Sequence, residues 1–358
     1  MNAQFTQHNL IFKQASGTSR GVLTTKETYL LEISKNGQKG IGECAIFRGL
    51  SYDDVPDYEE KLTWLCENIH SDFEVLKKEL LHYPSIIFGL EQALLNLEHG
   101  EDLYFPSDFT DGKDSIKING LIWMGNADFM QSQIEEKLAK GFDCIKLKIG
   151  VDWKSEKEII KKLREKFPKE QLELRVDANG AFSYEEASMV LQELADLGIH
   201  SIEQPIKKSE VRSPKSEENS EKKSTDCCIP WNKMARLCAE TPTPIALDEE
   251  LIGIIDFEEK KKLLETIKPQ YIILKPALVG GFSGSDEWIA IAESLGINWW
   301  ITSALESNIG LNAICQYTYT KKNPLPQGLG TGALFTNNFE THLQLEGDQM
   351  WHKKTPYY

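Results

Sequence analysis

Short apolar stretches of the sequence repeatedly end on side chains that could carry acid–base or metal chemistry. The first, CIKLKIG, alternates apolar residues with Lys146 and Lys148. Later stretches end on three carboxylates and one more lysine, namely Asp177, Glu203, Asp248 and Lys275. Because successive residues of a strand point to opposite faces, the two lysines of CIKLKIG share one face. Burying unpaired charge is costly, so we expect the lysines and carboxylates to be one another's partners.

The types of these residues predict a metal-assisted proton transfer. Three carboxylates from neighbouring strands suit Mg²⁺, which prefers oxygen ligands and keeps positions open for water or substrate. Zinc would prefer histidine or cysteine, and the seven histidines of the chain show no ligand spacing. Repulsion between Lys146 and Lys148 should lower the pKa of one of them, which suits a general base. The cation would stabilise negative charge on a substrate carboxylate when the neighbouring carbon loses its proton.

Each of these signals is weak when it is taken alone. A Lys-x-Lys pair on a strand usually lies on a solvated edge, and the segments DANG, EQP and LKP are common at turns and strand ends. Their order, with one motif at each strand end, favours a metal-dependent proton-abstraction site. The alternative is a barrel that has lost its chemistry and serves as a scaffold. That alternative predicts a missing ligand or base, and the sequence retains all of them.

The elements that would position these residues follow one another with a regular period. Eight apolar stretches are each followed by a helical pattern, with marker residues at positions 118, 146, 177, 203, 248, 275, 303 and 330. The steps are 26 to 31 residues, except for one of 45 that contains the polar stretch Lys207–Cys228. This period predicts a (β/α)₈-type barrel, with the active site at the carboxyl ends of its strands. The polar stretch predicts an inserted, mobile loop.

The first hundred residues show a different pattern, which predicts a separate α+β domain. Two apolar runs around Asn36-Gly37 indicate a hairpin, and the apolar spacing at 53–99 is helical. We therefore expect an α+β capping domain at 1–112, a barrel at 113–330 and a segment at 331–358 that returns to the capping domain. An open doubly wound sheet is the alternative α/β fold, but the Gly-rich first turn that it requires is absent.

Composition limits the partners that we expect. The chain has 358 residues and a net charge of −15, and it has no Lys/Arg-rich stripe that would follow a phosphate backbone. No apolar run is long enough to cross a bilayer, and the N-terminus lacks the pattern of a secretory signal. Seven scattered cysteines without a CxxC motif indicate reduced thiols. We expect a cytoplasmic protein with a small-molecule substrate, without nucleic acid or membrane as partner. The sequence does not determine the oligomeric state.

The motifs KLKIG, DANGAF, IEQP, ALDEE and LKP, in this order, resemble those of the enolase superfamily in its muconate-lactonising subgroup. The resemblance covers nearly the whole chain. It implies a (β/α)₇β TIM-like barrel with an N-terminal α+β capping domain. It also implies Mg²⁺, for which Mn²⁺ can substitute, bound by the residues that match the family's three metal ligands, Asp177, Glu203 and Asp248.

The same resemblance implies a role for each lysine. Lys148 and Lys275 would lie on opposite faces of the substrate, and Lys146 would be an auxiliary lysine. The first step would form a metal-stabilised enediolate. Asn179 and Glu249 match positions just behind the metal ligands, where supporting contacts are expected.

Two further segments, GECAIFRGLSYDD and ITSALESNIGL, resemble a capping-domain loop and the seventh-strand motif of the o-succinylbenzoate synthase family. This implies a lyase of menaquinone biosynthesis. Its reaction would be the syn-dehydration of 2-succinyl-6-hydroxy-2,4-cyclohexadiene-1-carboxylate, a small dicarboxylate, to 2-succinylbenzoate. Lys148 would remove the proton α to the ring carboxylate and then assist departure of the hydroxyl. Lys275 would stabilise the enediolate.

Residues outside the motifs are candidates for substrate contact. The stretch ASGTSRGVLTTKE has the composition of a lid over the barrel mouth, and its Arg20 and Lys26 could face the second carboxylate of the substrate. Ser303 and Glu306 follow the seventh strand, where Ser303 suits a substrate contact and Glu306 could equally be structural.

Related reactions of the subgroup are the rival functions. N-succinylamino acid racemisation would need the same lysines and ligands, and it stays open. Dipeptide epimerases usually carry an Asp-x-Asp at the eighth strand, where this chain has LGTGAL, so that branch is disfavoured. Muconate lactonisation is less favoured, because no residue distinguishes it.

Overall fold

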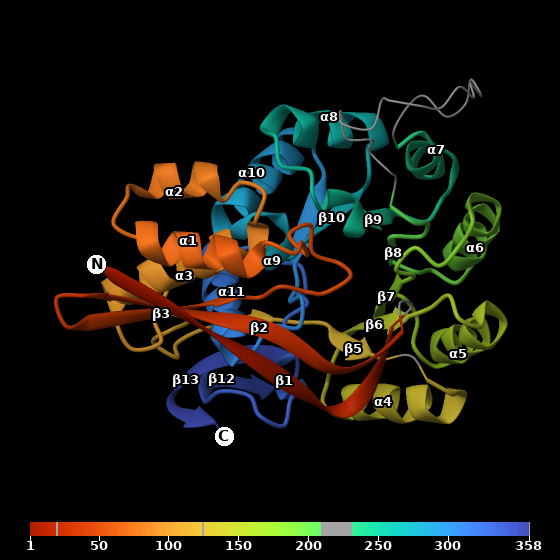
Figure 1. The fold of residues 1–358 in the computed structure, drawn as a ribbon. Helices are drawn as coiled ribbons and strands as arrows, with labels where there is room; N and C mark the ends of the chain where they lie inside the picture. The colour runs from red at the N-terminus through yellow and green to blue at the C-terminus, as the bar shows by residue number, and fades with distance from the viewer. Residues whose placement is uncertain (19–20, 124, 209–230, 358) are drawn as a thin grey trace, which may run out of the picture.

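The computed structural model describes residues 1–18, 21–123, 125–208 and 231–357. The candidate lid residue Arg20 and positions 209–228 of the expected insertion lie outside these ranges. Figure 1 shows an N-terminal sheet with three helices beside a curved array of parallel strands and outer helices. Among the described residues, no helix combines the length and apolar character needed to cross a membrane.

The N-terminal part is an antiparallel sheet covered by helices. The sheet has the order β1 (Asn2–Thr18), β2 (Gly21–Lys35) and β3 (Gln38–Cys44). The expected hairpin is confirmed: Asn36 and Gly37 connect β2 to β3 with φ values of 53° and 82°, which a two-residue hairpin turn of this kind requires. The helices are α1 (Tyr58–Asn68), α2 (Phe73–Glu79) and α3 (Pro84–His99).

Helix α3 approaches β3 unusually closely, because glycines stand at the contact. A Cβ atom on Gly42 would lie 2.0 Å from the carbonyl oxygen of Gly89, and one on Gly40 would lie 2.1 Å from that of Ala93. Neither approach is possible with a side chain in place. The close packing holds β3 in place, and its Glu43 accepts a hydrogen bond from Ser307 N of the second part at 3.0 Å.

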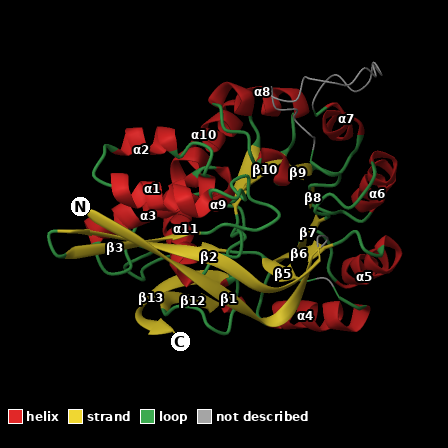
Figure 2. Ribbon diagram, viewed as in Figure 1, coloured by secondary structure: helices red, strands yellow, loops and turns green. Residues whose placement is uncertain are grey.

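The second part is a parallel sheet that curls into a barrel. Within the described residues its order is β11-β10-β9-β8-β7-β6-β5. The strands are β5 (Gly120–Ile122), β6 (Cys144–Lys148), β7 (Glu173–Asp177), β8 (Ser201–Glu203), β9 (Ile245–Leu247), β10 (Tyr271–Leu274) and β11 (Asn298–Ile301). The helices that follow them are α4 (Ala127–Ala139), α5 (Trp153–Lys166), α6 (Tyr184–Asp196), α7 (Asn232–Glu240), α8 (Phe257–Ile267), α9 (Pro276–Val279), α10 (Gly281–Ser294) and α11 (Asn308–Thr320). Figure 2 shows α4 to α8 outside the strands.

The barrel closes through a very short eighth segment. Gln327 pairs with Ile118 on one side, and Gly328 pairs with Thr302 on the other, each as a single parallel bridge. The expected first strand is divided at Ile118–Asn119, since β4 (Ser115–Lys117) pairs with a C-terminal strand and only β5 pairs with β6. The structure therefore agrees with the expected α/β capped barrel, although its first and eighth strands are the weakest of the ring.

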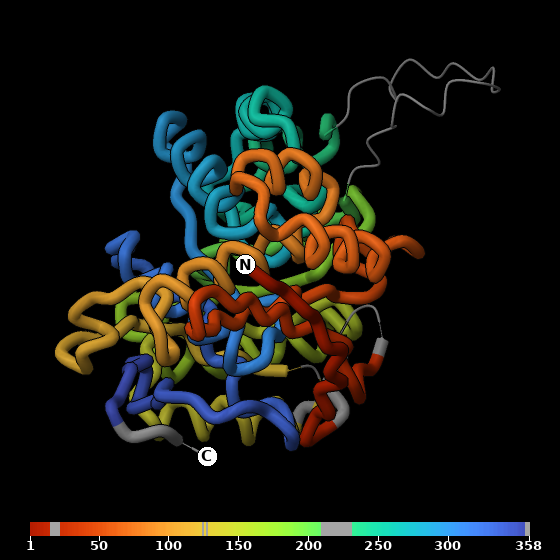
Figure 3. Tube along the Cα trace, turned by 60° about the vertical axis from the view of Figure 1, so that its left-hand side comes forward, coloured from red at the N-terminus to blue at the C-terminus, as the bar shows by residue number. Residues whose placement is uncertain are grey.

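The C-terminal segment touches both parts of the molecule. Phe335 forms a bridge with Phe12 of β1, and the backbone N–H of Thr336 donates to Ile11 O at 2.8 Å. The chain then forms a hairpin of β12 (Thr341–Glu346) and β13 (Gln349–Tyr357), which joins β4 in a separate sheet. Figure 3 shows the blue C-terminal segment passing close to the red N-terminal strands. The expected domain bounds stay a prediction.

Replacing Gly42 with alanine should destabilise the N-terminal part. The added methyl group must displace the α3 backbone, so we expect a loss of about 1–3 kcal/mol in the free energy of unfolding. Urea denaturation of Gly42→Ala measures it, with Gln38→Ala on the exposed part of β3 as the control. A stability equal to that of the control would show that the contact between β3 and α3 can relax without cost.

Candidate active site

The lysines of the sequence motifs and two of their three carboxylates line one cavity of about 500 Å³ at the carboxyl ends of the barrel strands. Its barrel side includes Lys146, Lys148, Asp177, Asn179, Glu203 and Lys275. Its other side is formed by residues 22–23 and 47–50 of the N-terminal part. Asp248 does not line the cavity but contacts Lys275 behind it.

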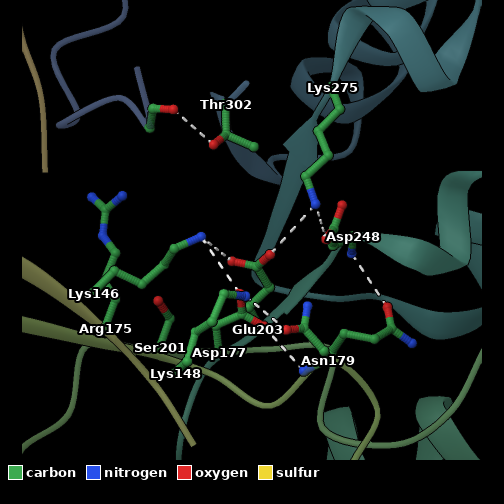
Figure 4. A network of polar contacts seen from close by, with 12 residues as sticks. Lys146, Lys148, Arg175, Asp177, Asn179, Ser201, Glu203, Asp248, Lys275 and Thr302 are labelled. Carbon is green, nitrogen blue, oxygen red and sulfur yellow. Dashed lines mark hydrogen bonds and ion pairs between the residues drawn. The ribbon is translucent and has the colours of Figure 1, made fainter. Parts of the chain in front are cut away.

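The register of the parallel strands brings these side chains together. Lys148 on β6 pairs with Asp177 on β7, which pairs with Glu203 on β8. Residues that are paired in this way point to the same face of a sheet, so the three side chains stand in a row. Asp248 and Lys275 directly follow β9 and β10 and continue the row, as Figure 4 shows. On β6 the alternating Ile145 and Leu147 pack in the main hydrophobic core.

Each lysine is held by at least one carboxylate. Lys146 Nζ lies 2.7 Å from Glu203 Oε2 and 3.8 Å from Asp177 Oδ2. Lys148 Nζ donates to Asp177 Oδ2 at 2.8 Å and to Asn179 Oδ1 at 2.7 Å. Lys275 donates to Asp248 Oδ2, and its Nζ lies 3.9 Å from Glu203 Oε1. The buried charges of the row are therefore compensated within the row (Figure 4).

These contacts change the pKa values in ways that the sequence did not reveal. Burial alone would lower the pKa of Lys146, but the charges of Glu203 and Asp177 outweigh it and raise that pKa. Lys275 shows the same balance, with burial opposed by Asp248 and Glu203, and its pKa is raised. The expectation of a lowered lysine pKa is therefore wrong for Lys146, because the carboxylates that neighbour the lysine pair act more strongly than lysine–lysine repulsion.

The carboxylates differ from one another in the same field. Burial would raise the pKa of Asp177, yet the charges of Lys148 and Lys146 hold it well below its usual range. Burial and the charge of Asp177 raise the pKa of Glu203 to about 7. Burial also raises the pKa of Asp248, although Lys275 opposes the shift.

The carboxylates offer oxygen donors to a cation, but each now faces a lysine. In the described structure, the carboxylates of Asp177, Glu203 and Asp248 do not place one oxygen each within 4.8 Å of one another. Glu203 Oε1 is buried and makes no hydrogen bond to the described residues, which leaves it available to a cation. Behind this set, the backbone N–H of Asn179 donates to Asp177 Oδ1 at 3.0 Å, and its Nδ2 donates to Glu249 Oε1 at 3.1 Å.

Ser303 and Glu306 occupy different positions, although both follow β11. Ser303 lines the cavity, whereas Glu306 is fully buried behind it. Glu306 Oε2 accepts from Ser303 Oγ at 2.5 Å and from Ala304 N at 2.8 Å. Ser303 Oγ also accepts from Thr331 Oγ1 at 2.8 Å. Glu306 therefore orients Ser303 and does not reach the cavity itself.

Lys26 lies behind the same wall of the cavity. It is buried on β2, and its Nζ makes no hydrogen bond to the described residues. Burial lowers its pKa, against the charges of Glu43 and Glu306. Lys26 does not line the cavity, so the structure does not place it where it could touch a substrate carboxylate.

Sequence reasoning missed Arg48, the arginine of the cavity wall. Arg48 belongs to the segment GECAIFRGLSYDD, whose resemblance to a capping-domain loop was the one available signal, but the sequence alone does not distinguish Arg48 from its neighbours. Arg48 Nε lies 3.0 Å from Glu27 Oε1, and Nη1 lies 2.8 Å from Asp54 Oδ1. These ion pairs hold the loop at 47–50 over the cavity.

Two family models match successive parts of the chain. Residues 3–97 match the family described as MenC, N-terminal domain. Residues 130–216 and 226–351 match the family described as Enolase C-terminal domain-like.

Individual relatives are similar over most of the chain. An o-succinylbenzoate synthase of Desulfotalea psychrophila is 41% identical, covering 97% of this chain and 98% of its own. The crystal structure of MenC from that organism matches with a TM-score of 0.82 and 39% identity, over 98% of this chain and 99% of its own. An N-succinylamino acid racemase of Thermus thermophilus is 33% identical over 82% of this chain and 75% of its own.

A more distant structure shares only the fold. It is a dipeptide epimerase of Enterococcus faecalis in complex with Mg and the dipeptide L-Leu-L-Tyr. It matches with a TM-score of 0.79 at 20% identity, over 98% of this chain and 96% of its own.

The buried position of Glu306 predicts a strong effect on the loop that carries Ser303. Glu306→Ala leaves Ala304 N without its acceptor and removes a negative charge from beside Lys26, so we expect a loss of about 2–4 kcal/mol in stability. Urea denaturation measures the loss, and Glu346→Ala, an exposed glutamate of β12, is the control. A loss below about 0.5 kcal/mol, typical of surface positions, would contradict the assignment.

Proposed function

We propose that this chain, which belongs to the enolase superfamily and within it to the o-succinylbenzoate synthase family, uses the lysine–carboxylate row as its active site. The enzyme is a lyase, and its reaction dehydrates 2-succinyl-6-hydroxy-2,4-cyclohexadiene-1-carboxylate to 2-succinylbenzoate in menaquinone biosynthesis. The identity of 41% to a synthase over nearly the whole of both chains is the observation that carries this conclusion.

The arrangement of the lysines supports a role for each in the reaction. Lys148, at the end of β6, removes the proton α to the ring carboxylate, and the same ammonium group then assists departure of the hydroxyl. One group acting in both steps accounts for a syn-elimination, because base and acid work on one face. Lys275, which directly follows β10, stabilises the negative charge of the enediolate from the other face. Lys146 is the auxiliary lysine that keeps Glu203 paired.

Asp177, Glu203 and Asp248 would hold the Mg²⁺ of the enzyme, and Mn²⁺ would substitute for it. The support is chemical: all three are oxygen donors at neighbouring strand ends, and Glu203 Oε1 is buried without a hydrogen bond to the described residues. Bound there, the cation supplies positive charge for the substrate carboxylate. Asp177 as a metal ligand would be shared between the cation and Lys148, whose Nζ lies 2.8 Å from its Oδ2, and a weaker ion pair would leave Lys148 able to face the substrate. Asn179 and Glu249 keep the ligands oriented.

The cavity suits a small dicarboxylate substrate. Its volume of about 500 Å³ fits within the range of small-molecule sites. The ring carboxylate would face the row, and the succinyl arm would extend toward the wall formed by Ser303 and the loop at 47–50. The part played by Arg20 remains a proposal, because that residue lies outside the described ranges. The described cysteines are free thiols, which supports a cytoplasmic location.

Racemisation of N-succinylamino acids is the second candidate. The observation in its favour is the identity of 33% to the Thermus racemase. The same two lysines would then act as base and acid on opposite faces. The two reactions are told apart by offering both substrates in deuterated water, since racemisation exchanges the α-proton without loss of water.

Removing either lysine should abolish turnover while the fold remains. We expect Lys148→Ala and Lys275→Ala to reduce kcat by about 10²–10⁴-fold or more, because each removes a group that acts on the reacting atoms. Ultraviolet absorbance follows loss of the cyclohexadiene with Mg²⁺ and with a chelator, and circular dichroism checks folding. Lys261→Ala, an exposed lysine of α8, is the matched control. A lysine variant with substantial turnover would remove that residue from the mechanism.

Mg²⁺ should stabilise the protein through the carboxylate row. A ligand that binds only the folded state and is present at a hundred times its Kd adds about 2.7 kcal/mol to the free energy of unfolding. The temperature of thermal unfolding should therefore rise in Mg²⁺. Asp177→Asn should lose most of the shift, whereas Asp196→Asn, on the exposed end of α6, should keep it. An equal shift in both variants would place the cation elsewhere.

A further inference from the structure

A second cluster of potential ligands lies where the C-terminal hairpin meets the linker after α3. One ring nitrogen each of His342 and His352 and one carboxylate oxygen of Asp102 lie within 4.8 Å of one another, and the described residues contain no other such group. We propose that these three side chains form a structural site for a transition-metal cation of the Zn²⁺ type, separate from the Mg²⁺ site of the reaction.

The three ligands come from segments far apart in the sequence. His342 Nδ1 lies 2.5 Å from Asp102 Oδ2, and His352 Nε2 lies 3.4 Å from the same oxygen. Across the hairpin, Leu343 pairs with His352, which brings the neighbouring His342 alongside it, with 5.2 Å between the imidazole centres. Tetrahedral zinc with bonds of about 2.0–2.2 Å needs ligand atoms roughly 3.3–3.6 Å apart. Small side-chain rotations, with loss of the hydrogen bond between His342 and Asp102, would therefore seat the ion.

His352 gives an independent reason to expect a ligand. The residue is 4% exposed, and neither ring nitrogen makes a hydrogen bond to the described residues. Buried polar atoms in folded proteins almost always have a partner in the protein, in ordered water or in an ion. A cation bound to Nε2 would supply that partner, and the position of Nε2 close to Asp102 directs it toward the same point.

The surroundings already hold the ligands in place. The backbone oxygen of Asp102 accepts from Asn312 Nδ2 at 2.9 Å and from Gln316 Nε2 at 2.8 Å, which fixes the linker on α11. The ring of Phe109 lies 5.8 Å from that of His352. Such supporting contacts orient metal ligands and raise affinity. A bound ion would connect the linker and the C-terminal hairpin, so its role is to stabilise the packing of the hairpin against the linker.

Ligand chemistry separates this site from the reaction site. Two imidazole nitrogens and one carboxylate favour Zn²⁺, whereas the three carboxylates of the barrel favour Mg²⁺. An excess of Mg²⁺ should therefore fill the barrel site and leave the histidine site free. This difference makes the two sites separable in one experiment.

The test is a Zn²⁺ titration of the full-length, metal-free protein in saturating Mg²⁺, followed by calorimetry. We expect one equivalent to bind, and the affinity to fall by about tenfold or more in His342→Ala. His342 is a quarter exposed, so its replacement should leave the fold intact, which circular dichroism checks. His70→Ala, an exposed histidine outside the cluster, should bind as the unchanged protein does. Co²⁺ should develop visible absorption in the unchanged protein and not in His342→Ala.

Parallel variants make the outcome decisive. Asp177→Asn should retain Zn²⁺ binding, because it alters only the barrel site, and Asp102→Asn should weaken it. Absence of Zn²⁺ binding in saturating Mg²⁺, or equal binding by His342→Ala and the unchanged protein, would overturn the proposal. Loss of binding in Asp177→Asn alone would place the zinc at the barrel site and overturn it as well.

Discussion

The barrel depends on the mutual compensation of buried charges. Three ammonium groups inside a protein are tolerated only because each lies against a carboxylate on the same inner face, as Lys146 does with Glu203 at 2.7 Å. The same rule holds further down β7, the strand that ends on Asp177: Arg175 pairs with Glu173 at 2.7 Å, and its guanidinium lies 4.2 Å from the Trp300 ring centre. A cation that enters such a balanced network must compete with the lysines for their carboxylates. Metal binding at the proposed ligands would therefore free lysine ammonium groups from their carboxylates.

A buried carboxylate also joins the N-terminal part to the barrel. Glu43 on β3 accepts from Ser307 N at 3.0 Å and from Gly310 N at 2.9 Å, at the first turn of α11. A carboxylate at a helix N-terminus satisfies donors that the helix leaves open and meets the positive end of its dipole. Thr28 Oγ1 on β2 donates to the same glutamate at 2.8 Å. The seventh strand-end loop, which carries Ser303, is thereby fixed between two domains and can serve as a rigid wall.

Features that depend on the local periodicity of the sequence could be predicted. Features that depend on contacts between residues far apart in the sequence could not. The alternation along β6 was enough to predict that Lys146 and Lys148 point inward. The repeat of strand and helix was enough to predict the barrel. The sequence does not show how short the eighth strand is. In the structure, Gln327 and Gly328 each contribute only a single bridge. A lowered pKa is wrong for Lys146 because the expectation counted the lysine two residues away and not the carboxylates across the sheet.

Glu306 and the two histidines of the C-terminal hairpin show the same limit in other ways. Glu306 follows a strand end, as the proposed metal ligands do, yet its side chain lies behind the cavity wall and orients Ser303. The spacing of the sequence does not distinguish these two positions. His342 and His352 have no ligand spacing in the sequence, because the register of a hairpin and the separate linker residue Asp102 bring them together.

Substrate choice must come from residues that the shared chemistry does not use. Both reactions proposed for this chain would use the same two lysines on either side of a carbon next to a carboxylate, so the row cannot distinguish them. The remaining wall is built from the loop at 47–50, held by Arg48 through Glu27 and Asp54, and from Ser303, held by Glu306. In the proposed reactions this wall would face the substrate away from the reacting carbon, where a succinyl arm on a ring and one on an amino acid differ in shape. Changes there would alter KM for one substrate against the other, while the lysines would continue to set the rate of proton removal for both.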